Sequence, residues 1–248
     1  MDQVLLITGG GRGIGAATAL RAAKRGAAVA VNYPSTPLAA DEVVRTIRAG
    51  GGTAMAVQAD VGDEAQVLAM FAKVDAKLGR LTALVNNAGV VDVQARVDEM
   101  SVARLERMFR INVIGSFVCA REAVKRMSTK HGGEGGAIVN ISSGAARIGS
   151  PGQYVDYAAS KAAIDTLTIG LAKEVADEGI RVNAVRPGVI DTDIHASGGQ
   201  PGRAAEMGPG VPMKRSGTAE EIAGAVLWLL SPEASYTTMA LLDVTGGR

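Results

Sequence analysis

Tyr157 and Lys161 lie four residues apart, at the start of a segment with the composition of a helix. Side chains at positions i and i+4 share one face of a helix, so the phenol and the ammonium are expected side by side. A phenol is protonated near neutral pH and can donate a proton, and a nearby cation makes it a stronger acid. The pair is therefore a candidate acid/base for proton transfer. Taken alone, such a pair is more often ordinary helix surface.

A glycine-rich loop joins the first apolar run, Val4–Thr8, to an Ala-rich helical segment. The loop reads Thr8-Gly9-Gly10-Gly11-Arg12-Gly13-Ile14-Gly15. Glycines let the backbone turn sharply and approach a pyrophosphate, whose charge is stabilised by the free N–H groups of a helix start. A tight turn is the competing explanation, but the place of the loop after the first strand of an alternating chain favours dinucleotide binding. A P-loop is excluded because no Lys-Ser or Lys-Thr follows the glycines.

The end of the second apolar run favours NADP(H) as the dinucleotide. In ordinary dinucleotide sites an acidic residue about twenty positions after the glycines bonds the adenosine ribose. Here the run ends Asn32-Tyr33, and the first acid is Asp41. Without that carboxylate a 2′-phosphate meets no repulsion, and Arg12, together with the amide of Asn32, could bond it. NAD(H) is the less favoured alternative, in which Arg12 is solvated and Asn32 serves the ribose.

Short apolar runs alternate with longer helical segments along the whole chain, without an internal repeat or a shift in composition. Strands are expected at Val4–Thr8, Ala27–Tyr33, Thr53–Asp60, Thr82–Asn86, Ala137–Ser142, Arg181–Arg186 and Ala240–Val244, and helices near 13–25, 38–49, 63–78, 101–127, 157–178 and 218–230. The strands are nearly continuous in Val, Ile, Leu and Ala, as expected where helices cover both faces of a parallel sheet. The alternation predicts one α/β domain over 1–248, a Rossmann-like doubly wound parallel sheet of about seven strands with helices on both faces.

Residues 191–217 interrupt this alternation. Glycine and proline punctuate the segment at Gly198-Gly199, Pro201-Gly202 and Gly208-Pro209-Gly210, and it has no clear periodicity. A stretch of this length without regular structure is usually a binding loop or a lid. We therefore expect a substrate lid over 191–217.

Charge and composition exclude several classes of protein. The 26 basic and 25 acidic side chains nearly cancel, so no basic field is available for nucleic acid or an anionic membrane surface. The first residues have the features of neither a signal peptide nor a membrane span. The one cysteine, Cys119, cannot form an internal disulfide, which fits a reducing cytoplasm. We therefore expect a cytoplasmic protein. No His/Cys cluster has metal-ligand spacing, so we expect no metal site.

Further motifs make the chain similar to the short-chain dehydrogenase/reductase family over essentially its whole length. With the glycine loop and Tyr157-x-x-x-Lys161, they are Asp60-Val61, Asn86-Asn87-Ala88-Gly89, Asn112, Asn140-Ile141-Ser142-Ser143 and Arg186-Pro187-Gly188. They occur in the order found in the family and at its approximate intervals. A single motif could match by chance, but the full set hardly could. The resemblance implies an oxidoreductase that moves a hydride between a nicotinamide cofactor and a carbonyl or secondary alcohol.

The resemblance also implies the catalytic roles of four residues. Tyr157 would protonate the substrate oxygen during reduction or take its proton during oxidation. Lys161 would lower the pKa of this tyrosine and hold the nicotinamide ribose. Ser143 would hydrogen-bond the substrate oxygen, and Asn112 would hold a water that links Lys161 to solvent. Asn112 lies in an apolar helix pattern, so a structural hydrogen bond is an equal alternative for its side chain.

Contacts with the dinucleotide follow from the same resemblance. Asp60 and Val61 would contact the adenine, and Thr192 would meet the nicotinamide amide. The complete expected set is Gly9, Gly11, Arg12, Gly13, Ile14, Gly15, Asn32, Tyr33, Asp60, Val61, Asn86, Ala88, Gly89, Tyr157, Lys161, Pro187, Gly188, Val189, Ile190 and Thr192.

The catalytic serine departs from the usual spacing of the family. Counted from Asn140 it is Ser143, which lies one residue further from Tyr157 than usual. Counted back from Tyr157, the usual interval reaches Gly144, which has no hydroxyl. Ser143 is preferred because a strand end fixes direction more firmly than a flexible loop. Ser142 is then expected to point to the opposite face.

The substrate is indicated only by the loops near the site, whose polar side chains are Arg147, Gln153, Asp156, His195 and Gln200. Such loops resemble those of family members that act on sugars or polyols. A 3-oxoacyl thioester is the alternative substrate, with Arg203, Lys214 and Arg215 facing an acidic carrier, although these cations are more simply solvated. An alternative of another class is a catalytically silent dinucleotide-binding regulator, which would have no chemical need for the complete catalytic set.

Two helical segments carry more apolar residues than one sheet face requires. These are the segments near 101–127 and 157–178. In the family they form the interface of a dimer, and tetramers are frequent. We therefore expect a homotetramer, with a small-molecule carbonyl or alcohol as the other partner.

Overall fold

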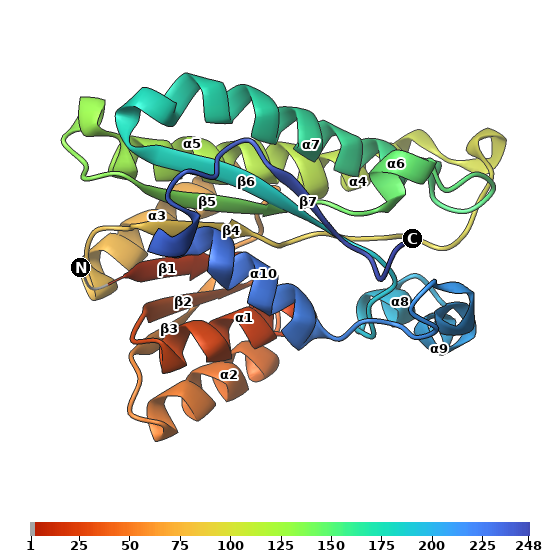
Figure 1. Cartoon of the computed structure of the whole chain (residues 1–248), viewed down its shortest axis with the longest axis horizontal. Helices are drawn as coiled ribbons and strands as arrows, with labels where there is room; N and C mark the ends of the chain where they lie inside the picture. The colour runs from red at the N-terminus through yellow and green to blue at the C-terminus, as the bar shows by residue number, and fades with distance from the viewer. Residues whose placement is uncertain (1–2) are drawn as a thin grey trace.

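Seven parallel strands form one sheet in the computed structural model, which describes residues 3–248 (Figure 1). Their order across the sheet is β3-β2-β1-β4-β5-β6-β7. The strands are β1 (Val4–Ile7), β2 (Ala28–Tyr33), β3 (Ala54–Gln58), β4 (Ala83–Asn86), β5 (Gly136–Ile141), β6 (Ile180–Pro187) and β7 (Leu241–Val244). The strand order reverses between β1 and β4, and ligands of open α/β sheets bind at the carboxyl ends of strands beside such a point. The expected fold class is confirmed.

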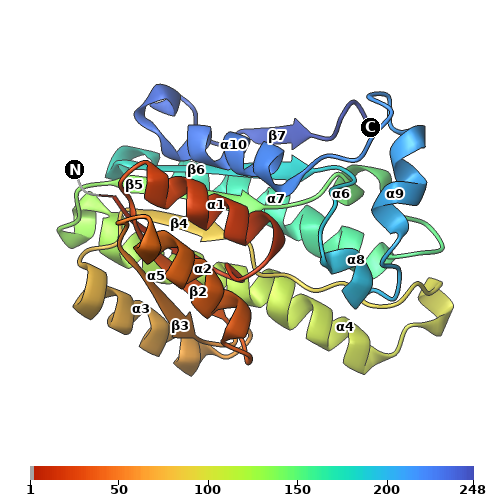
Figure 2. The same cartoon turned by 90° about the horizontal axis from the view of Figure 1, so that it is seen from below.

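Helices cover both faces of this sheet. They are α1 (Gly13–Lys24), α2 (Leu38–Ala49), α3 (Glu64–Leu78), α4 (Val102–Phe109), α5 (Gly115–Met127), α6 (Ala145–Ile148), α7 (Val155–Val175), α8 (Ile194–Ser197), α9 (Arg203–Met207) and α10 (Ala219–Leu230). Figure 2 shows α1, α2 and α10 together on the face turned to the viewer, and α3, α5 and α7 cover the other face. No helix within residues 3–248 has both the length and the apolar composition that crossing a membrane requires.

The apolar composition of the strands follows from burial on two sides. In β1, Leu5 and Ile7 pack into the core beneath α1, α2 and α10, whereas Val4 and Leu6 pack into the core beneath α3, α5 and α7. Successive side chains of a strand point to opposite faces, so both sets of positions must be apolar where both faces are covered.

Two expected helices have a more complex structure than their periodicity indicates. The segment near 101–127 divides into α4 and α5, which are joined by a π-helical turn at Arg110–Ile114. The segment near 157–178 begins at Val155 and ends in a 3₁₀ turn at Ala176–Glu178. Short π turns insert into helices frequently at functional sites, and Asn112 lies at the centre of this one.

The segment 191–217 is not without regular structure, so this part of the expectation is wrong. It contains α8, α9 and a 3₁₀ turn at Gly208–Gly210. These pieces are only four, five and three residues long, too short to give a clear periodic pattern. Figure 1 places α8 and α9 beyond the carboxyl ends of the strands, on the same side as α6.

Candidate active site

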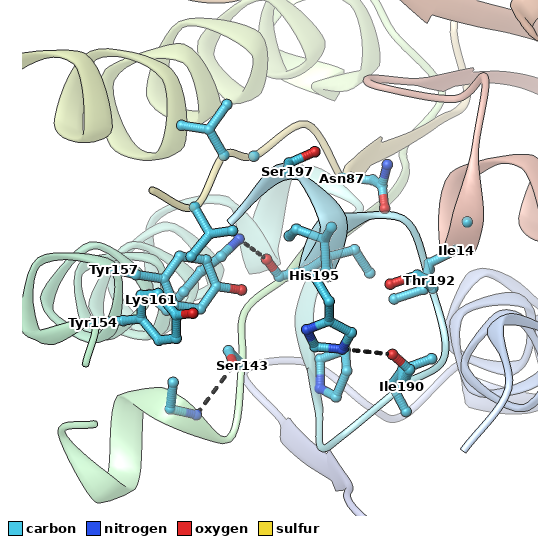
Figure 3. Close-up of a pocket in the computed structure, with 18 of the residues that line it drawn as sticks. Ile14, Asn87, Ser143, Tyr154, Tyr157, Lys161, Ile190, Thr192, His195 and Ser197 are labelled. Atoms are coloured by element: carbon cyan, nitrogen blue, oxygen red, sulfur yellow. Dashed lines mark hydrogen bonds between the residues drawn. The ribbon is translucent and has the colours of Figure 1, made fainter. Parts of the chain in front are cut away.

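A cavity of about 1030 Å³ opens at the carboxyl edge of the sheet. Its lining comes from the loops that follow β1 to β6, with further side chains from α7, α8 and α9. Most of the residues expected to act lie around it: Gly9, Arg12, Gly13, Ile14, Asn32, Asp60, Val61, Ala88, Gly89, Ser143, Tyr157, Lys161, Pro187, Gly188, Val189, Ile190 and Thr192. Figure 3 shows several of them facing one another across the cavity.

The glycine loop forms one end of this cavity. Gly9 and Gly13 have positive φ angles of 61° and 50°, a conformation that side chains other than hydrogen rarely tolerate. A Cβ atom on Gly13 would also lie 3.2 Å from Cγ2 of Thr192. Helix α1 begins at Gly13, and its first turn holds neither a side-chain cap nor an acidic residue. Its N–H groups are thus free for an anion, and the loop fits the pyrophosphate of a dinucleotide.

Asn87 holds the glycine loop in place, a role that the sequence analysis missed. Its Nδ2 donates to the carbonyl oxygens of Thr8 and Gly9, both at 2.9 Å. A Cβ atom on Gly15 would lie only 2.7 Å from this Nδ2, so Gly15 serves this packing and does not line the cavity. The motif that contains Asn87 was visible in the sequence, but Asn86, the residue expected to contact the ligand, does not line the cavity. Asn86 is buried and donates instead to Ser116 and Asn140.

The end of β2 also differs from the expectation. Asn32 lines the cavity, but its Oδ1 accepts from the N–H of Gly9 at 3.1 Å and its Nδ2 donates to the carbonyl of Ala59 at 3.0 Å. Both polar atoms thus bind the main chain, so Asn32 supports the glycine loop and is not free to bond a phosphate. Tyr33 packs against the core beside α2 and lies outside the cavity lining. Gly11 is also outside it, because it faces the backbone of Ala40.

Tyr157 and Lys161 face the cavity from the first turns of α7, as their spacing requires (Figure 3). The Nζ atom of Lys161 lies 5.7 Å from the centroid of the Tyr157 ring. The same Nζ donates to the carbonyl oxygen of Ile141 at 2.8 Å, at the end of β5. This contact fixes the beginning of α7 against the strand that leads to the serines.

Ser142 and Ser143 point in opposite directions, as alternation along an extended strand end predicts. The hydroxyl of Ser142 is buried and donates to the carbonyl of Lys161 at 3.1 Å. Ser143 lines the cavity, and its Oγ accepts from the N–H of Ala145 at 3.1 Å. Gly144 lines the cavity as well, but it has no hydroxyl to present there.

Burial is the largest influence on the pKa values of Tyr157 and Lys161. Desolvation raises the pKa of the Tyr157 phenol, and a hydrogen bond with Ser143 partly opposes the rise. Desolvation lowers the pKa of Lys161 to about 8, with the charge of Asp165 opposing the shift. The direction of the shift at Tyr157 is the reverse of the one expected from a nearby cation, because burial of the phenol is its largest cause.

Asn112 lies behind the cavity lining, where it is 1% exposed. Its Oδ1 accepts from the N–H of Val90 at 2.8 Å, and its Nδ2 donates to the carbonyl of Val90 at 2.9 Å and to Oγ of Ser160 at 3.1 Å. The side chain thus makes structural hydrogen bonds with both of its polar atoms, which is the alternative that the sequence left open beside the binding of a water. A Cβ atom on Gly89 would lie 3.4 Å from Nζ of Lys161 and 3.5 Å from Oδ1 of Asn112. Asn112 therefore fixes the loop after β4 beside Lys161.

Among the loop residues, Arg147 and Asp156 lie away from the cavity lining. Arg147 pairs with Asp243 at 2.6 Å, and the buried Asp156 pairs with Arg104 at 2.8 Å. Gln153, Tyr154, His195 and Arg203 do line the cavity. Within residues 3–248, no group of three or more His, Cys, Asp or Glu side chains is arranged to hold a metal ion.

Comparisons with known proteins agree on one family. A family model described as enoyl-(acyl carrier protein) reductase matches residues 9–248. The uncharacterized oxidoreductase YgfF of Escherichia coli is 56% identical, with 99% of each chain covered. Glucose 1-dehydrogenase 2 of Bacillus subtilis is 39% identical, over 99% of this chain and 94% of the relative. A double mutant of a short-chain dehydrogenase/reductase from Serratia marcescens has a TM-score of 0.90 at 35% identity, over 99% of this chain and 97% of that one.

The chain belongs to the short-chain dehydrogenase/reductase family. As a short-chain dehydrogenase/reductase it is an enzyme, an oxidoreductase of hydroxyl or carbonyl groups that uses a nicotinamide dinucleotide. This finding favours an enzyme over the alternative of a catalytically silent regulator.

Proposed function

We propose that the protein transfers a hydride between NADP(H) and a small polar carbonyl compound or the corresponding alcohol, with Tyr157 as acid/base. The observation that carries this proposal is the placement of a half-buried phenol, flanked by Ser143 and Lys161, in the same cavity as the free start of α1. A nicotinamide dinucleotide bound along this cavity would supply or accept the hydride.

The side chains of the chain itself would handle the proton and the developing charge. During reduction the hydroxyl of Ser143 donates a hydrogen bond to the substrate oxygen, which becomes negative as the carbon gains the hydride. Tyr157 gives its phenolic proton to that oxygen, and the proton is later replaced from solvent. The phenol is protonated near neutral pH, as a proton donor must be, and its pKa is raised further by burial. Lys161 would hold the ribose of the nicotinamide when the cofactor is bound, and its charge would stabilise the transient phenolate.

The preference for NADP(H) rests on Arg12. Its side chain is exposed, lines the cavity and forms no ion pair with a carboxylate of residues 3–248. The nearest strand end, at Asn32, places an amide where a carboxylate would repel a 2′-phosphate, and that amide is engaged with Gly9 and Ala59. Arg12 thus remains as the phosphate ligand, while Asn32 shapes the loop.

Sugars and polyols are the first substrate class to consider. Gln153, Tyr154 and His195 bring hydrogen-bonding groups to the substrate end of the cavity, and the Bacillus subtilis relative bears the name of a glucose dehydrogenase. A 3-oxoacyl thioester remains the second candidate, because the matching family model is named for a reductase of acyl carrier protein substrates.

We also propose that the protein is a homotetramer. Large apolar side chains stay exposed along α4, the π turn and α5, with exposures of 69% for Val102, 55% for Ile114 and 48% for Phe117. Exposed apolar patches of this kind mark surfaces that associate. A second copy of the chain would cover them.

Tyr157→Phe tests the function directly. This variant removes the transferable proton and leaves the ring, so turnover should fall by roughly two to four orders of magnitude. The dissociation constant of NADP(H) should change little. Tyr236→Phe is the matched control, since Tyr236 is fully exposed. Near-normal turnover in purified Tyr157→Phe would refute the assignment.

A further inference from the structure

Arg203 lies in the segment 191–217 and lines the cavity at its substrate end. It is the first residue of α9, and its half-buried side chain lines the cavity. Arg215 differs, because it forms an exposed ion pair with Glu221 at 2.6 Å outside that cavity. Lys214 is also exposed and outside the lining. Of the three cations that the sequence offered for an acidic carrier, only Arg203 lines the cavity, whereas Lys214 and Arg215 lie outside it.

Neutral groups alone hold the guanidinium of Arg203 within the part of the chain that the structure describes. One terminal nitrogen donates to Oε1 of Gln200 and the other to Oε1 of Gln153, both at 2.7 Å. The guanidinium carbon lies 5.1 Å from the centroid of the Tyr154 ring. A guanidinium removed from water is normally paired with a carboxylate, and none of residues 3–248 supplies one here.

These contacts fix the orientation of Arg203 without using its full hydrogen-bonding capacity. Oε1 of Gln200 also accepts from the hydroxyl of Tyr154 and from Nε2 of Gln94, both at 3.1 Å. Three donors thus converge on one oxygen and hold it toward the arginine. A guanidinium has five N–H donors, and the contacts with Gln200 and Gln153 engage two of them. The remaining donors can bind a carboxylate, the anion whose planar geometry matches the fork of an arginine.

Other charged side chains line the cavity, among them Arg107 and Arg248 as cations and Asp92 and Asp193 as carboxylates, and neither carboxylate pairs with Arg203. Asp92 is engaged by Arg107 at 3.4 Å, and Asp193 is exposed to solvent. His195 lines the same cavity, and its pKa is lowered chiefly by burial, with the charge of Arg203 also lowering it. Burial thus favours the neutral form of the His195 imidazole.

Tyr154 connects this cation to the proposed chemistry. It is the N-cap residue of α7, three residues before Tyr157, and Figure 3 draws both side chains on the α7 side of the cavity. Resting on the proposed function of Tyr157, we propose that Arg203 binds a carboxylate of the substrate. The substrate is then a short oxo acid, or the corresponding hydroxy acid, that reaches both Tyr157 and Arg203 within the cavity.

Matched substrates that differ only in the anionic group test this proposal. The pairs are succinic semialdehyde against butanal and levulinate against 2-pentanone, each followed by oxidation of NADPH. In the wild type, kcat/KM should favour the acid of each pair by at least tenfold, the scale of a charge-assisted hydrogen bond. Arg203→Met should abolish most of this preference through KM, and Arg203→Lys should restore part of it. Arg215→Met is the control and should keep the full preference.

Gln153→Glu keeps Arg203 in place but gives its guanidinium a carboxylate partner within the protein, so that it is no longer available to the substrate. The new carboxylate is nearly isosteric with the amide and would pair with the guanidinium, so the preference for acids should also fall. Calorimetric titration of the NADP(H)-loaded protein with succinate measures anion binding without turnover, and Arg203→Met and Gln153→Glu should both weaken it by at least tenfold.

The two proposals fail in different ways. Equal kcat/KM for acids and neutral partners, or succinate binding that Arg203→Met leaves unchanged, would overturn the role of Arg203 while the hydride-transfer function stands. Turnover that survives Tyr157→Phe would refute Tyr157 as the acid/base, whereas the succinate titration would still report on Arg203. Thermal unfolding of each variant identifies any loss that arises from misfolding.

Discussion

The ammonium of Lys161 donates to the carbonyl oxygen of Ile141, and Ser142, the next residue, donates back to the carbonyl oxygen of Lys161. The two hydrogen bonds, of 2.8 and 3.1 Å, join the end of β5 to the second turn of α7. Ser143 and Tyr157, one on each of these elements, thereby keep a fixed separation. The extra residue expected between them from the spacing of the motifs would lie in the loop that includes α6, where the chain can lengthen without moving either residue.

Lys161 should make the stability of the protein depend on alkaline pH. Burial lowers its pKa from 10.5 to about 8, so between these values the unfolded chain binds more protons than the folded protein. The free energy of unfolding should therefore rise with pH in this window, by about 3 kcal/mol in total. Lys161→Met has no such proton. Urea unfolding from pH 7 to 10.5 should show the wild type gaining stability relative to the variant, and parallel curves would contradict the shifted pKa.

The two adjacent serines should respond differently to alanine. Ser143→Ala removes a donor that faces the cavity, so turnover should fall by about a hundredfold or more. Ser142→Ala removes a buried bond to Lys161, which should cost about 1 kcal/mol of stability with a much smaller effect on turnover. Steady-state kinetics and urea unfolding of both variants separate the effects. The reverse pattern would place the catalytic hydroxyl at Ser142.

Arg12 should determine the choice of cofactor. With one or two charge-assisted bonds to a 2′-phosphate, the wild type should bind NADP(H) at least tenfold more tightly than NAD(H). Arg12→Ala should weaken NADP(H) and leave NAD(H) nearly unchanged. The dissociation constants are to be compared at low salt, because salt screens an exposed charge. Tighter binding of NAD(H) by the wild type would reverse the assignment.

The segment 191–217 should close over the cofactor. Helices of four and five residues have little stability of their own, and Thr192 in the same segment lies against the glycine loop at Gly13. Trypsin should cut first at the exposed Lys214 in the protein without ligand, and NADP(H) should slow the cleavage. Equal cleavage rates with and without NADP(H) would argue against a lid.

The sequence predicts what depends on periodicity and local spacing. Alternating apolar runs are sufficient for the parallel sheet, and the i, i+4 spacing is sufficient to bring Tyr157 and Lys161 to one face. The roles of Asn32 and Asn87 were out of reach, because both side chains bind main-chain atoms of distant loops. The same limit applies to Arg203, whose neutral partners become known only when Gln153 and Gln200 are brought together in space.

The π turn at Arg110–Ile114 sets the angular phase between α4 and α5. Each residue of an α-helix turns the chain by about 100°, and a π turn contains the equivalent of one inserted residue. Removing one residue here would merge the two helices into a regular one and rotate α4 by that angle relative to α5. Asn112 would then turn away from Val90, and the apolar surface of Val102 would face another direction. The single extra residue of the π turn therefore determines two features together: the position of Asn112 behind Lys161 and the direction in which the exposed apolar surface faces.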